Sequence, residues 1–213
     1  MVDSTAQTIS VGGGLFTSNH DVFKKGRQIQ FELGKKISKT VLLSCSYSYG
    51  RSPNNKEFHP IYFLSSFLQP PSDTFFNVNE VNKYSVETYL VKTRILLNAN
   101  QDLNVFITPI LGISMLSEAI TYRSADYNNN VEYKEWYPTL GLEAGLERHL
   151  NKSKTVFAST SYCLLKIYSE DSWTDVYNPS FMSQNTFYCS LQIRLRFQFS
   201  EKFQKKQSEE ETP

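Results

Sequence analysis

The stretch FYCSLQIRLRFQF, residues 187–199, alternates apolar and polar side chains along nearly its whole length. One face carries Phe, Cys, Leu and Ile, and the other carries Tyr, Ser, Gln and Arg. Successive side chains of a β-strand point to opposite faces of the sheet. The pattern therefore predicts a strand with one apolar face and one polar face.

Seven further segments alternate in a similar way. Most of the segments run about 10 to 15 residues, enough for the roughly 9–11 tilted residues with which a strand crosses a bilayer. They lie at about residues 8–17, 27–36, 40–50, 84–98, 103–116, 135–149 and 154–168. The segment 154–168 leaves its apolar face open between two sets, Val156, Ala158, Tyr162 and Leu164 or Phe157, Cys163 and Leu165.

The connections between these segments alternate strictly between long and short. Short ones lie at residues 37–39, 99–102 and 150–153, and long ones at 18–26, 51–83, 117–134 and 169–186. All long loops then share one rim, and both termini lie at the other. Outer-membrane barrels have this asymmetry between short periplasmic turns and long outward loops. Residues 1–199 are therefore predicted to form a closed, eight-stranded, antiparallel up-and-down transmembrane barrel.

Composition narrows the class of protein. The 213 residues carry a net charge of +1, which suggests neither nucleic-acid binding nor a polybasic membrane patch. No apolar run approaches the roughly 20 residues of a spanning helix. A search for long apolar runs does not detect barrel strands, because only alternate residues of such a strand are apolar. Cys45, Cys163 and Cys189 have no metal-ligand spacing and are expected to be free thiols. No cofactor or metal is expected.

The size of the polar-face residues indicates which face points inward. A soluble lipocalin-like carrier of an apolar ligand would be apolar inside and polar outside. Small residues instead suit the crowded lumen of an eight-stranded barrel, so the polar face is assigned to the lumen. The small residues on that face are Gly12, Gly14, Ser44, Ser46, Ser48, Gly112, Ser114, Gly141 and Gly145.

Seven charged residues on the same face are expected at two adjacent levels of the lumen. Buried charges must be paired or they cost several kcal/mol each. A paired network would close the barrel rather than leave a pore. The lower level is predicted to hold Glu32, Arg94, Glu147 and Arg196, and the upper level Lys92, Glu143 and Arg194. The alternative is that these are unrelated charges on a solvated face.

The segments ISVGGGL (9–15), LGLEAGL (140–146) and IRLRFQF (193–199) together resemble eight-stranded outer-membrane proteins of the OmpA/OmpX type. The resemblance implies insertion by the outer-membrane assembly machinery, which reads a last strand ending in an aromatic residue, here Phe199. Residues 200–213 follow that aromatic, unlike barrels that end at it, and we expect a disordered periplasmic tail there. Residues 1–7 have neither the basic start nor the apolar core of a signal peptide, so we expect a mature region with an added Met, the alternative being that the membrane interpretation is wrong. The Ala6-Gln7 junction also resembles signal-cleavage sites of Bacteroidetes proteins.

An enzymatic site finds little support in the sequence. The three histidines are His20 and His59 in long loops and His149 at the short-turn rim. No arrangement of nucleophile, base and carboxylate is recognisable. A non-enzymatic protein is therefore expected, and a lipid-modifying enzyme of the outer membrane is the alternative.

The second long loop is unusually apolar. Phe63, Leu64, Phe67 and Leu68 fall on one helical face that ends at Pro70-Pro71. This turn either caps the barrel mouth or contacts a partner protein or lipid, because exposed apolar patches mark such sites. The predicted partner-binding residues are Phe58, Ile61, Tyr62, Phe63, Leu64, Phe67 and Leu68, with Trp173 and Tyr177 in the fourth long loop.

These observations favour an outer-membrane protein with both termini in the periplasm. We expect it to contact outer-membrane lipid and lipopolysaccharide and to bind a protein partner through residues 51–83, without nucleic acid. Its expected role is that of an interaction or accessory subunit of an envelope complex.

Overall fold

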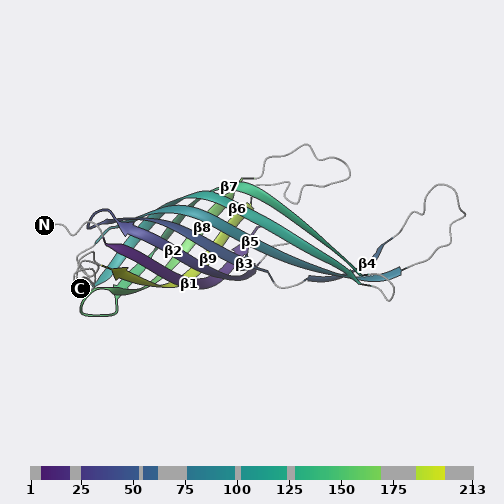
Figure 1. Ribbon diagram of the computed structural model, residues 1–213, viewed down its shortest axis with the longest axis horizontal. Helices are drawn as coiled ribbons and strands as arrows, with labels where there is room; N and C mark the ends of the chain where they lie inside the picture. Colours follow the sequence, from purple (N-terminus) through teal and green to yellow (C-terminus); the bar gives the residue numbers. More distant parts are fainter. Residues whose placement is uncertain are drawn as a thin grey trace, which may run out of the picture.

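The computed structural model describes residues 6–19, 25–52, 55–61, 76–98, 102–123, 128–168 and 186–199. All regular structure in these ranges is β-strand (Figure 1). The strands are β1 (Gln7–Ser18), β2 (Lys25–Lys36), β3 (Val41–Arg51), β4 (Asn55–Ile61), β5 (Phe76–Leu96), β6 (Leu103–Arg123), β7 (Asn128–His149), β8 (Val156–Ile167) and β9 (Thr186–Phe199).

Eight of these strands close into a barrel. The sheet order is β3-β2-β1-β9-β8-β7-β6-β5-β4, and an additional pairing of β3 with β5 joins its two sides. All pairs are antiparallel, and Gln7 of β1 pairs with Phe199 of β9 at the short-turn end. β4 pairs only with β5, outside the barrel. The predicted eight-stranded up-and-down barrel is confirmed.

Two of the predicted long loops contain long strand segments. β5 begins at Phe76 and β4 occupies Asn55–Ile61, both inside the predicted loop 51–83. β6 continues to Arg123 and β7 begins at Asn128, so the predicted loop 117–134 is mostly a hairpin. These extensions pair with one another beyond the barrel, as in the Tyr122–Asn129 pair. A ribbon in solvent needs no apolar face, so alternation in the sequence does not reveal it.

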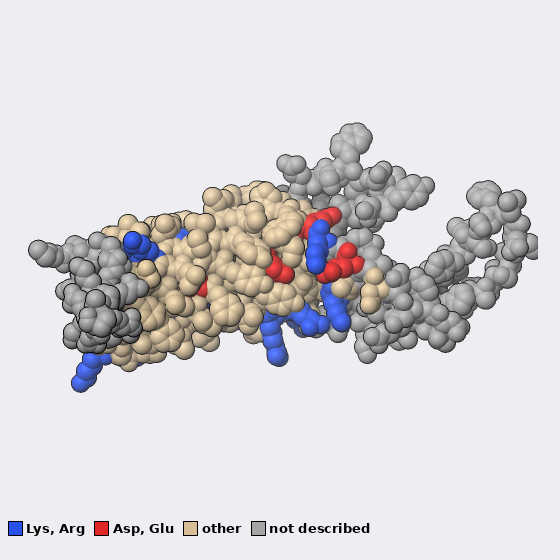
Figure 2. Space-filling view, viewed as in Figure 1, with Lys and Arg blue, Asp and Glu red and all other residues tan. Residues whose placement is uncertain are grey.

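The outer wall carries an apolar belt. Leu33, Leu191 and Ile193 are 64%, 55% and 68% exposed, as expected for side chains that face lipid rather than water. Figure 2 shows a broad band of wall nearly without charged side chains between two charged ends. This arrangement is the opposite of a soluble carrier's, so that alternative is wrong. Within the described ranges, no helix is long and apolar enough to span a membrane.

Aromatic side chains mark the belt near the long-loop end. The rings of Tyr47 and Tyr89 lie 5.1 Å apart, and Tyr89 lies 5.7 Å from Trp136. Both tyrosine hydroxyls donate hydrogen bonds to Glu87, at 3.2 and 3.1 Å. Amphipathic rings of this kind are enriched where a barrel wall meets the lipid headgroups.

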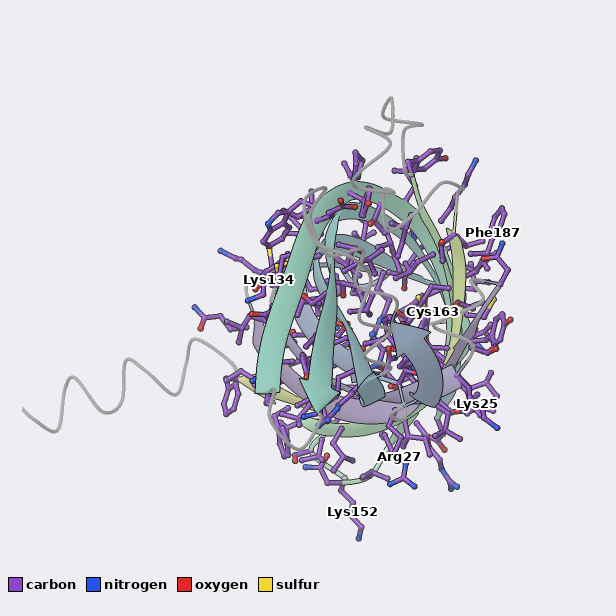
Figure 3. All side chains as sticks on the ribbon, turned by 90° about the vertical axis from the view of Figure 1, so that its right-hand side faces the viewer. Lys25, Arg27, Lys134, Lys152, Cys163 and Phe187 are labelled. Carbon is purple, nitrogen blue, oxygen red and sulfur yellow. The ribbon has the colours of Figure 1, made fainter. Side chains whose placement is uncertain are left out.

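The lumen is filled by side chains (Figure 3) and has two chemically different halves. The half toward the long-loop end is an apolar cluster, which includes Phe16, Tyr84, Leu116 and Tyr188. Burial also settles the face of β8, because Phe157, Cys163 and Leu165 are buried inside while Tyr162 and Leu164 are exposed outside. Cys163 and Leu165 pack in the apolar cluster, whereas Phe157 lies at the short-turn end of the lumen.

Candidate functional site

The half of the lumen toward the short-turn end holds two levels of ion pairs. At the upper level Glu143 binds Lys92, with Nζ and Oε2 3.2 Å apart, and also binds Arg194. At the lower level Glu147 binds Arg94, with 3.0 Å between Nη1 and Oε2, and also binds Arg196. Each of these two carboxylates therefore has two cationic partners.

Glu32 connects the two levels. Its carboxylate lies 3.6 Å from Lys92 Nζ, 3.6 Å from an Arg94 nitrogen and 3.3 Å from an Arg194 nitrogen. The Ser44 hydroxyl donates a further hydrogen bond of 3.0 Å to it. The side chains come from β2, β5, β7 and β9, so the pairs run across the lumen from different walls.

The structure thus brings together all seven charged residues that the sequence placed in the lumen. Each is at most 4% exposed. Two aromatic partners were not foreseen: Arg94 lies over the Phe106 ring at 4.4 Å, and Arg196 lies over the Phe157 ring at 3.9 Å. Such contacts favour a desolvated cation. Phe106 lies between Asn104 and Thr108 on the inward face of β6, an aromatic break in the polar pattern there.

Every carboxylate of the network is paired with two or three cations. Among the described residues, no group of three or more His, Cys, Asp or Glu side chains is placed to hold a metal ion. Of the three histidines, His149 packs on Phe157 at the short-turn end with ring centroids 4.6 Å apart. His20 and the side chain of His59 lie outside the described part of the chain.

At the opposite end the sheet continues past the barrel as a ribbon of β4 and the outer parts of β5, β6 and β7 (Figure 1). β8 pairs with β7 only from Thr139 onward. The last bond on that side is donated by the Tyr168 N–H to the Pro138 carbonyl at 2.9 Å. No described strand pairs with the remaining edge of β7, residues 128–137, which we call the β7 edge.

Most of the predicted partner-binding residues lie outside the described part of the chain. Phe58 and Ile61 lie in β4, where the structure describes the backbone but not the side chains. The others lie outside the described residues: Tyr62, Phe63, Leu64, Phe67, Leu68, Trp173 and Tyr177.

The sequence matches no known protein-family model and no curated protein. Solved structures do match. Neisserial surface protein A is 11% identical with a TM-score of 0.52, over 91% of this chain and 99% of its own. A second match is Ail, the attachment invasion locus protein of Yersinia pestis, in its complex with the heparin analogue sucrose octasulfate. It is 14% identical with a TM-score of 0.52, and the match covers 92% of this chain and 99% of Ail. A major outer membrane protein of Thermus thermophilus is 10% identical with a TM-score of 0.50, and the match covers 91% of this chain and 99% of that protein.

The chain has the fold of the eight-stranded outer-membrane barrels. The similarity covers nearly the full length of each neighbour, and the apolar belt independently identifies a transmembrane wall. At these levels of identity the likeness establishes the fold alone. The neighbours come from Neisseria, Yersinia and Thermus, so the suggested Bacteroidetes origin remains unsupported.

Proposed function

We propose that this protein is a non-enzymatic outer-membrane barrel that acts as an interaction or accessory subunit through its outward ribbon and loops. Its fold and apolar belt support a place in the outer membrane. A lumen filled by an apolar cluster and an ion-pair network argues against a pore. The recognition surface is therefore expected on the ribbon that projects beyond the membrane.

The observation that carries this proposal is the β7 edge. The Pro138 carbonyl points toward β8, and groups two residues apart in a strand point to the same side. The N–H groups of Trp136, Lys134 and Glu132 therefore point toward the side on which β8 no longer pairs. An edge of this length that no described strand covers can act as a template for an added strand from another chain. A partner that supplies an extended segment fits this surface.

The first prediction concerns the orientation of the barrel in the outer membrane. Both ends of the described barrel, Gln7 and Phe199, lie at the short-turn end, which we place in the periplasm. An epitope tag inserted at Asn129, beside the tip of the β6–β7 hairpin, should bind antibody on intact cells. A tag after Pro213 should bind only after the outer membrane is permeabilised. Antibody labelling of the C-terminal tag on intact cells would contradict the orientation.

A second prediction tests the β7 edge. Lys134→Pro removes one edge N–H, which a solvent-facing edge strand tolerates. Lys134→Ala removes the same side chain and its exposed 3.0 Å ion pair with Glu132 but keeps the N–H. The proline variant should fold and insert normally yet lose a partner that the wild type retains on purification from native membranes. The alanine variant should keep that partner.

Two further variants separate the ribbon from the apolar loop. Phe63→Asp and Phe67→Asp change loop residues that lie outside the described part of the chain, and aromatic anchors often dominate binding energy. If the loop is part of the same surface, these variants should also lose the partner while remaining inserted. If the proline, alanine and aspartate variants all retain the wild-type set of co-purifying proteins, the proposed interaction surface is wrong.

A further inference from the structure

A cationic cavity lies at the short-turn end of the lumen, below the ion-pair network. Its volume is about 230 Å³, and no carboxylate is among its described lining residues. We call it the cationic mouth. Six basic side chains line it: Lys36, Lys39, Arg94, His149, Lys154 and Arg196.

The nearby carboxylates are already engaged. Glu147 binds both Arg94 and Arg196. Glu32 and Glu143 bind the cations of the upper level, Lys92 and Arg194. The network alone holds four cations against three carboxylates, and Lys36, Lys39 and Lys154 raise the cations to seven. Asp102 is exposed at the rim and interacts with His149. Among the described residues, positive charge is therefore in excess at this end of the lumen.

We propose that the cationic mouth binds a small soluble oxyanion of the phosphate class with two or more negative charges, entering from the periplasmic side. Arginine and lysine bind phosphate oxygens by charge-assisted hydrogen bonds, and the low dielectric of the lumen strengthens them. The cavity has room for one or two linked phosphate groups but not for a folded partner. The site is distinct from the outward ribbon and does not depend on the function proposed there.

The test measures binding of inorganic pyrophosphate to the full chain in detergent at low ionic strength, by titration calorimetry. The wild type should bind saturably, and its thermal unfolding should shift upward with ligand. Lys36→Gln with Lys154→Gln should weaken binding about tenfold or more. The matched control is Lys35→Gln with Lys152→Gln, the exposed sequence neighbours that do not line the mouth (Figure 3 shows Lys152 pointing away from the barrel).

The control variant should bind within about twofold of the wild type. If Lys36→Gln with Lys154→Gln fails to fold, Lys39→Gln, which changes an exposed turn residue, provides the same comparison. Absence of saturable binding, or equal weakening in the test and control variants, would overturn the proposal. A marked gain in affinity after Glu209, Glu210 and Glu211 are changed to Gln would also overturn it, because the chain's own acidic segment would then be the occupant.

Discussion

Replacing Arg94 with Met should destabilise the folded barrel by about 3–5 kcal/mol, the usual cost of breaking a buried ion pair. The substitution removes one of two cationic partners of Glu147 and one of three that surround Glu32. Arg196→Met should act similarly through Glu147. The free energy of unfolding can be measured by urea titration in lipid vesicles, with Trp fluorescence as the signal.

Two comparisons make this result specific to the network. Lys25→Met changes an exposed cation on β2 and should alter stability by less than about 0.5 kcal/mol. Adding Glu147→Gln to the Arg94→Met and Arg196→Met double variant should recover much of the lost stability, because the carboxylate that lost both partners is then neutral. Equal stability of all these variants would show that the pairs do not contribute to folding.

Gly12→Val should prevent the barrel from closing correctly, at a cost of about 3 kcal/mol or more, the upper end for overpacking. A Cβ atom on Gly12 would lie 2.2 Å from Cγ of Arg194 and 2.6 Å from the Ile193 carbonyl oxygen. The valine would therefore displace Arg194 from its pairs with Glu143 and Glu32. Loss of heat-modifiable mobility on a gel, which reports the folded barrel, would show this effect.

The adjacent residue Gly13 provides the matched control. A Cβ there meets only the Gln28 carbonyl oxygen, at 3.2 Å, which a small adjustment relieves. Gly13→Val adds the same volume to the outer wall and should fold nearly as well as the wild type. Similar behaviour of the two valine variants would contradict the inward placement of Gly12.

The two ends of the molecule are proposed to have different roles. The ion-pair network and the apolar cluster fill the lumen between the two ends. The proposed recognition surface, the β7 edge, lies at one end, and the proposed anion site, the cationic mouth, lies at the other. The two proposed activities can be removed separately, by Lys134→Pro at one end and by Lys36→Gln with Lys154→Gln at the other.

The sequence by itself determined the barrel. Strict alternation, as in residues 187–199, identifies strands and their faces, because a strand has a side-chain period of two. The alternation of short and long connections then gives the up-and-down order. The seven lumen charges were also found from the sequence, since equal distance from a short turn gives equal height in an up-and-down barrel.

Only the tertiary structure decided three other features. The outward ribbon is held by cross-strand hydrogen bonds, such as those around the Tyr122–Asn129 pair, which leave no apolar signature in the sequence. The inward face of β8 was ambiguous because both its lumen side and its lipid side are apolar. The cationic mouth joins Lys36 at the end of β2, Lys39 in the turn after it and Lys154 in the β7–β8 turn to Arg94 and Arg196. Closing the barrel brings these parts of β2, β5, β9 and the two turns together, although they come from regions far apart along the chain.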